Sequence, residues 1–125
     1  MSRRIARGML ATALASLALA AAAGPATTKE YKGTVKGEET QSYTVTVEAN
    51  QTLSVALKAS RSSTWFNVTP PGSKDAIWVG SVEGNEKPFR QKLETAGDYR
   101  IDVGLDRAAA HRNGKADFTL SVSVN

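Results

Sequence analysis

The amino-acid sequence predicts an all-β fold, a small antiparallel β-sandwich of about eight short strands. Short runs of alternating apolar and polar residues recur along residues 27–125 at spacings of roughly 8–12 residues. Gly, Pro, Asn and Asp separate these runs, and no long stretch after residue 26 has the apolar period of an amphipathic helix. This combination is typical of an antiparallel sandwich, in which each strand buries one face.

Six of the expected strands precede the C-terminal pair. Turn-forming residues bound them: Asn50 lies in one turn, and Pro70 ends a strand because proline cannot continue a central ladder. A polar lead is expected at 27–30 and a polar loop at 58–63. The six strands are expected at 31–35, 42–48, 53–57, 65–68, 77–79 and 89–93.

The two C-terminal strands show the clearest alternation. Tyr99, Ile101 and Val103 alternate with charged residues, and 118–124 alternates Phe, Leu and Val with Thr and Ser. A period of two means that each strand has one buried face. On the other face, the recurring aspartates of 98–102 are expected to be ordinary solvent-exposed residues of a sandwich strand.

The first 26 residues are expected to be a secretory signal peptide, followed by a single β-sandwich domain at 27–125. Three arginines precede an apolar, alanine-rich stretch at 9–23, with a small-residue cleavage site at Ala21 to Ala23. The stretch is short for a membrane span. A signal peptide of this kind predicts a periplasmic or secreted protein.

Charge and composition exclude several function classes. Three of the 16 basic residues and none of the 12 acidic ones lie in the first 26 residues, so the remainder has a net charge of +1. That balance does not predict nucleic-acid binding. The chain has no Cys, one His and no G-x-S-x-G motif, so we expect no enzyme. We expect no cofactor and no metal, because zinc sites need more His or Cys and no EF-hand pattern occurs.

The connector between the two C-terminal strands is the strongest candidate for function. It runs from 104 to 115, longer than most hairpin loops, and carries Arg107, His111 and Arg112. Two conformations are open. Asp106 could cap a short helix that ends with a left-handed Gly114, which would place Arg107 and His111 on one face. Alternatively, residues 113–114 could form a tight type I′ turn.

The chemistry of this connector suits an acidic cleft on a partner protein. A guanidinium pairs bidentately with carboxylates, and the alanines at 108–110 keep the segment slim. The alternative is that the connector is an ordinary solvent-exposed loop whose basic residues bind no partner. A second possible surface is an aromatic platform that includes Trp65 or Trp78. Because Trp65 and Phe66 are adjacent in one strand, they must face opposite ways.

Residues at both ends of the domain resemble the periplasmic proteinaceous inhibitors of g-type lysozyme. The resemblance is carried by G-x-Y-x-I-x-V at 97–103, R-x-x-A at 107–110 and F-x-L-x-V at 118–122. The N-terminal part matches in outline through Y-x-G-x-V-K-G at 31–37. The resemblance implies a small β-sandwich that binds a g-type lysozyme or a related muramidase by inserting loops into the substrate cleft.

The resemblance also implies contact positions. Of two family arginines four residues apart, the first matches Arg107 and the second falls on His111, beside Arg112. A family tyrosine falls on Glu38 and a family serine on Ala96, so the sequence departs from the family at these positions.

The same sequence skeleton resembles, more loosely, the pre-peptidase C-terminal modules of secreted enzymes, which have a jelly-roll-like sandwich. This second resemblance implies a non-catalytic module that binds glycans or an envelope partner. A structural envelope protein without an enzyme partner is a third possibility.

Overall fold

The computed structural model describes residues 26–125, which form a sandwich of two four-stranded antiparallel sheets. The predicted fold class is therefore confirmed. The predicted signal peptide lies outside the described residues, apart from its last position. No helix within the described part of the chain is long and apolar enough to span a membrane. The strands are β1 (Thr27–Lys36), β2 (Gln41–Val47), β3 (Thr52–Ala59), β4 (Thr64–Thr69), β5 (Trp78–Val79), β6 (Phe89–Lys92), β7 (Gly97–Leu105) and β8 (Lys115–Val124).

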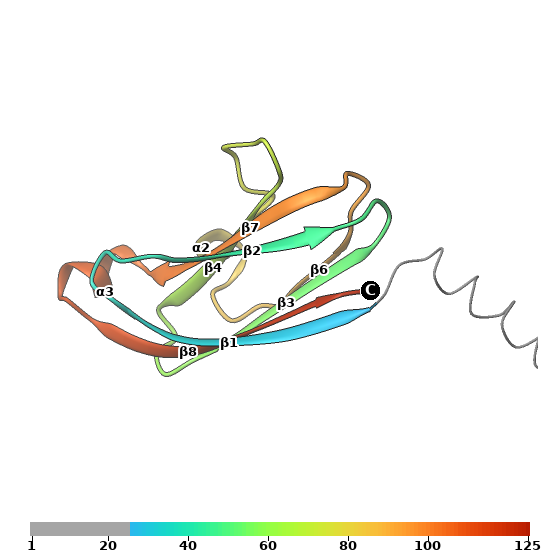
Figure 1. The fold of residues 1–125 in the computed structure, drawn as a ribbon. Helices are drawn as coiled ribbons and strands as arrows, with labels where there is room; N and C mark the ends of the chain where they lie inside the picture. The colour runs from blue at the N-terminus through green and yellow to red at the C-terminus, as the bar shows by residue number, and fades with distance from the viewer. Residues whose placement is uncertain (1–25) are drawn as a thin grey trace, which may run out of the picture.

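The chain changes sheet at almost every connection. One sheet has the order β1-β8-β3-β6 and the other β2-β7-β4-β5, and β4–β5 is the one sequential pair that stays within a sheet among the described residues. Figure 1 shows the two layers, with the long strands β7 and β8 lying in different sheets. The connection from β7 to β8 must therefore cross one end of the sandwich.

Alternate residues of both sheets fill the space between them. Phe66, Ile101, Leu120 and Val35 are fully buried, each at 0% exposure. With no cysteine in the chain, no disulfide supports this core. Stability therefore comes from the burial of apolar surface and from the strand ladders.

Several strands extend beyond their predicted ends, whereas β5 and β6 are each one residue shorter than predicted. β1 begins at Thr27 instead of residue 31, because Thr27 pairs with Val124 at the end of β8. The predicted loop at 58–63 loses its first two residues to β3, and the predicted connector at 104–115 loses both of its ends to β7 and β8. These residues join the strands through backbone pairing, although their side chains do not alternate clearly between apolar and polar.

The sequence did not predict the short helix α2 (Gly80–Glu83), which directly follows β5. Four residues are too few to show a helical period. The Gly80 amide donates to the Asn67 side-chain oxygen at 3.1 Å. A Cβ at Gly80 would lie 2.6 Å from the Phe66 carbonyl oxygen, so only glycine fits this close approach to β4.

Trp65 and Phe66 face opposite sides of β4, as predicted. Phe66 is buried in the core, whereas Trp65 lies half-buried on the outer face with its ring over Gly104. A Cβ on Gly104 would be 2.6 Å from Trp65 Cζ2. Trp78 packs between Phe66 and Phe89, with ring centroids at 6.1 and 5.5 Å. Trp78 therefore packs against the core, and both tryptophans are half-buried.

Removal of the Phe66 ring tests the importance of the core. We expect Phe66→Ala to lower the free energy of unfolding by about 3–5 kcal/mol, because it leaves a cavity between the sheets. Val82→Ala is the matched control, since Val82 on α2 is 77% exposed, and its effect should stay within about 0.5 kcal/mol. Urea denaturation followed by tryptophan fluorescence measures both. Equal effects of the two substitutions would contradict the proposed core.

Candidate functional site

The connector between β7 and β8 contains a helix, α3 (Arg107–His111). Asp106 caps its N-terminus, because the Asp106 carboxylate accepts a hydrogen bond from the Ala109 amide at 3.1 Å. The Ala110 amide donates to the Asp106 carbonyl oxygen at 2.9 Å. Of the two conformations that the sequence left open, the capped helix is confirmed.

The C-terminus of α3 corrects one detail and excludes the tight turn. The left-handed residue is Asn113, with φ of 55°, and not Gly114. The Asn113 amide donates to the Ala110 oxygen and the Gly114 amide to the Ala109 oxygen, at 3.0 and 2.8 Å. These two bonds form a Schellman motif. A type I′ turn is wrong here, because it needs positive φ at both 113 and 114. Position 114 needs a glycine for a different reason, because a Cβ added there would lie only 2.9 Å from the Ala109 carbonyl oxygen.

Two alanines anchor α3 to the sandwich. Ala109 and Ala110 are 2% and 8% exposed and belong to the core cluster. Arg107, His111 and Arg112 are all exposed. Within residues 26–125, none of these three side chains takes part in an ion pair or hydrogen bond. The α3 segment therefore presents unpaired basic side chains on a backbone that the two buried alanines hold in place.

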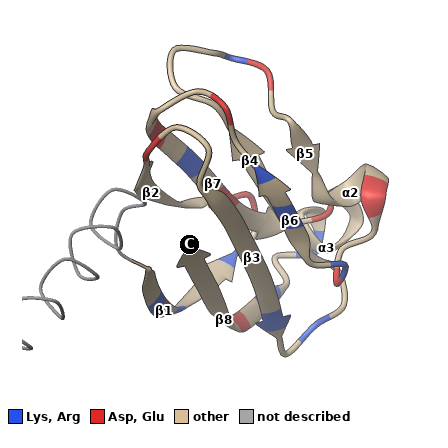
Figure 2. Ribbon diagram, turned by 90° about the vertical axis from the view of Figure 1, so that its right-hand side faces the viewer, with Lys and Arg blue, Asp and Glu red and all other residues tan. Residues whose placement is uncertain are grey.

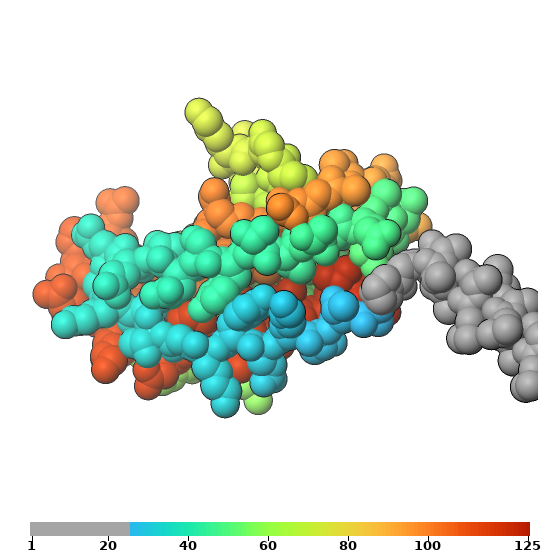
Figure 3. Space-filling view, in the orientation of Figure 1, coloured from blue at the N-terminus to red at the C-terminus, as the bar shows by residue number. Residues whose placement is uncertain are grey.

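Two neighbouring turns brace the same end of the molecule. The Gly37 amide, between β1 and β2, donates to the Gly114 oxygen at 2.9 Å, which places the adjacent, exposed Glu38 beside the end of α3. Between β3 and β4, the Ser63 oxygen accepts from the Asp106 amide at 2.9 Å. Figures 1 and 3 show the α3 segment and the β1–β2 turn together at the left-hand end of the molecule.

We call Glu38, Arg107, His111 and Arg112 the α3 tip. The structure brings these four predicted site residues to one end of the sandwich and places the fifth, Ala96, at the other. Ala96 immediately precedes β7, and α3 follows the end of that strand. β7 has nine residues, and a strand of that length spans about 30 Å. The sequence already implied this separation, because the alternating residues at 99–103 predict an extended strand between Ala96 and the connector.

Trp65 lies close to the tip, although the sequence suggested it only as part of a platform. Thr64 pairs with Leu105, and Trp65 pairs with Gly104, two residues before the Asp106 cap. Its half-buried ring thus extends the exposed surface from the α3 end onto the outer face of the second sheet. Only the pairing register between β4 and β7 shows that Trp65 lies near the α3 tip.

The acidic residues of β7 form an ordinary polar sheet face, as predicted. Asp102 pairs with Arg100 at 3.1 Å and accepts from the Ser42 hydroxyl at 2.6 Å. Asp98 accepts from the Thr46 hydroxyl at 2.7 Å. Across residues 26–125, no three His, Cys, Asp or Glu side chains gather as a metal site would require. The acidic groups of β7 thus have local partners on the sheet.

Solved structures resemble this fold closely. An inhibitor from Aeromonas hydrophila, PliG, described as a periplasmic lysozyme inhibitor of g-type lysozyme, is 30% identical, with a TM-score of 0.71 over 80% of this chain and 88% of its own. A mutant of Escherichia coli PliG is 18% identical, with a TM-score of 0.61 over 82% and 91% of the two chains. Salmonella Typhimurium PliG is 20% identical, with a TM-score of 0.60 over 78% and 91%.

The fold and the similarity define a small periplasmic β-sandwich. The chain belongs to the family of periplasmic inhibitors of g-type lysozyme, because the Aeromonas hydrophila relative matches at 30% identity over 88% of its length. The more distant E. coli and Salmonella structures support the fold alone. No family model matches the sequence, and no curated protein does.

The Asp106 cap is expected to hold α3 in shape. Asp106→Ala should lower the free energy of unfolding by about 0.5–2 kcal/mol, because the Ala109 amide loses its acceptor. It should also speed hydrogen exchange at the Ala109 amide. Asp106→Asn is the control, since asparagine caps helices about as well as aspartate. Equal losses for both variants would show that the charge of Asp106, and not its capping bond, stabilises α3.

Proposed function

We propose that this protein is a non-catalytic inhibitor of a g-type lysozyme and that it blocks the enzyme by placing the α3 tip in the substrate cleft. The similarity to the Aeromonas hydrophila inhibitor supports the partner class. The unpaired, exposed Arg107 on an anchored helix is the observation that supports the tip as the contact. The proposed partner is a lysozyme of this type or a related muramidase.

The proposed contact is between a guanidinium and cleft carboxylates. Glycosidases act through carboxyl groups that flank the scissile bond. Arg107 has five N–H donors in a planar fork, which suits bidentate pairing with such a carboxylate. In free solution this guanidinium keeps its water shell and gives up no internal ion pair on binding.

Pre-organisation favours the same contact. The α3 backbone is held by the Asp106 cap, the two buried alanines and the bond from Gly37 to Gly114. A loop that is already ordered loses little backbone entropy when it docks. Binding then costs mainly the side-chain freedom of the exposed residues.

The other tip residues are proposed as supporting contacts. His111 lies one helical turn after Arg107, so the two side chains project from the same side of α3. Arg112 adds a second guanidinium at the end of the helix. Glu38 adds a carboxylate from the adjacent turn, which is proposed to meet a hydrogen-bond donor on the enzyme rim.

Removal of the Arg107 guanidinium tests the proposal most directly. Arg107→Ala should raise the inhibition constant against a g-type lysozyme at least about thirtyfold, because truncation of one partner of a buried charge pair costs about 2–5 kcal/mol. Arg100→Ala is the matched control, since Arg100 lies on the outer face of β7 and pairs with Asp102. A muramidase activity assay measures both. If the Arg107 variant inhibits as well as the unchanged protein, the tip is not the contact.

The distance between the two ends predicts that Ala96 is dispensable for tip insertion. Ala96→Lys adds bulk and charge at an exposed position, yet inhibition should change by less than about twofold, because a strand about 30 Å long separates it from α3. The same assay applies, with a thermal melt to confirm folding. A large loss of inhibition would mean that the enzyme also contacts the opposite end of the sandwich.

A further inference from the structure

The outer face of the β1-β8-β3-β6 sheet is hollowed in two places. One hollow of about 540 Å³ has side chains of β1, β8 and β3 around it. A second, of about 320 Å³, lies over β3, β8 and the start of β6. The polar residues lining the first are Lys32, Thr34, Lys58, Ser60, Asp117 and Thr119.

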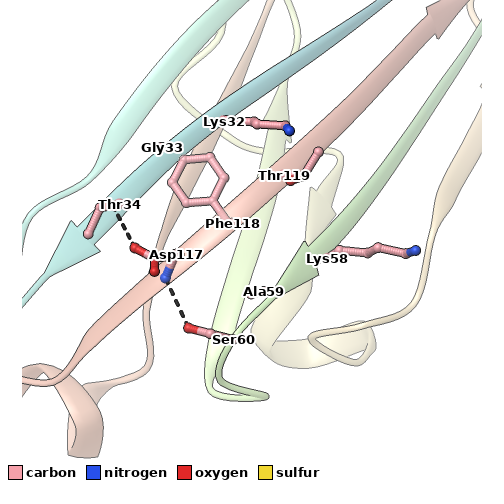
Figure 4. A pocket seen from close by; sticks show the side chains of 9 residues that line it. All are labelled: Lys32, Gly33, Thr34, Lys58, Ala59, Ser60, Asp117, Phe118 and Thr119. Carbon is pink, nitrogen blue, oxygen red and sulfur yellow. Dashed lines mark hydrogen bonds between the residues drawn. The ribbon is translucent and has the colours of Figure 1, made fainter.

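Strand register explains the hollow. Lys32 on β1 and Lys58 on β3 both lie opposite Thr119 on β8, so two long side chains flank a short one. Neighbouring strands are about 4.8 Å apart, which puts the backbones of the two lysines about 10 Å from each other. Figure 4 shows the lysines on either side of Thr119, with Thr34, Asp117 and Ser60 in the adjacent row.

The two hollows follow each other along the same strands. The outward positions 54, 56 and 58 of β3 pair with 123, 121 and 119 of β8 in antiparallel register, and the Ser60 amide, just after β3, donates to the Asp117 oxygen. Small residues occupy the middle of this path, where Ala56 pairs with Ser121 and Ser54 with Ser123. Arg90 on β6 flanks the far part, opposite Ser54. Together they make a shallow trough roughly 20 Å long, since each strand residue adds about 3.3 Å.

The cations of the trough are available to a ligand. Lys32, Lys58 and Arg90 form no ion pair or hydrogen bond among the described residues. The Asp117 carboxylate accepts from the Thr34 hydroxyl at 2.8 Å. Both lysine side chains extend away from Asp117 in Figure 4. In Figure 2, blue segments mark Lys and Arg on β1, β3 and β6 of this sheet.

The floor of the trough offers unused hydroxyls. Thr119, Ser121 and Ser54 are half-buried on the outer face. Their side chains have no hydrogen-bond partner within residues 26–125. A hydroxyl both donates and accepts, so such a floor matches the hydroxyl groups of a carbohydrate. The large exposed apolar side chains of the described chain, Ile77 and Val82, lie on other segments.

We propose that this trough binds a linear acidic polysaccharide. The Ser and Thr hydroxyls would hydrogen-bond to sugar hydroxyls, while Lys32, Lys58 and Arg90 pair with carboxylates along the polymer. A lipid surface fits less well, because the large exposed apolar side chains among the described residues, Ile77 and Val82, lie on other segments. A nucleic acid fits less well too, since three cations release few counterions. None of the trough residues belongs to the α3 tip, and the proposal does not depend on the proposed inhibition.

Affinity electrophoresis of the purified protein in gels containing polygalacturonate tests this proposal, with neutral dextran as the reference polymer. We expect retardation by polygalacturonate and none by dextran. Lys32→Gln with Lys58→Gln should weaken the affinity at least tenfold. Lys74→Gln with Arg100→Gln removes the same charge from the opposite sheet and its β4–β5 loop, so it should leave the affinity within about twofold.

A second variant separates a shaped site from general charge attraction. Ser121→Leu fills the trough and keeps every charge, so it should also weaken retardation at least tenfold. Thermal melts confirm that each variant is folded. Absence of retardation for the unchanged protein overturns the proposal. It is equally overturned if the control pair loses as much affinity as the lysine pair, or if Ser121→Leu binds normally.

Discussion

The functional end of this protein depends on the packing of Ala109 and Ala110, the buried residues of α3, against the core. β7 and β8 belong to different sheets, so the chain between them must cross the end of the sandwich. Two small apolar side chains allow the helix to lie close to the core, and larger ones would hold it off. With Ala109 and Ala110 on the side of α3 that faces the core, Arg107 and His111 lie on the side that faces solvent.

Bracing from other parts of the chain makes this end a rigid unit. The Gly37 amide reaches the Gly114 oxygen, and the Asp106 amide reaches the Ser63 oxygen. Both bonds join segments distant in sequence. Arg61 adds a third link through its Nε, which donates to the Lys115 oxygen at 2.8 Å. A tip held in this way can present charged side chains in a defined geometry, as an inhibitor that enters a cleft requires.

The two sheets differ on their outer faces, although the net charge of residues 27–125 is only +1. On β2 and β7, aspartates accept hydrogen bonds from neighbouring hydroxyls and pair with Arg100. On β1, β3 and β6, the cations flanking the trough remain unpaired. The partner that each surface suits therefore depends more on its local charge, which strand register sets, than on the net charge of the protein.

The sequence by itself determined the sandwich class, the inward face of most strands and the opposite facing of Trp65 and Phe66, because a period of two is a local property. It also narrowed 104–115 to two conformations through the capping residue Asp106 and the pair at 113–114. Only the tertiary structure chose the helix, since the burial of Ala109 and Ala110 depends on residues far away in the chain. Long-range pairing likewise placed Lys32 and Lys58 on either side of Thr119, an arrangement that no local pattern encodes.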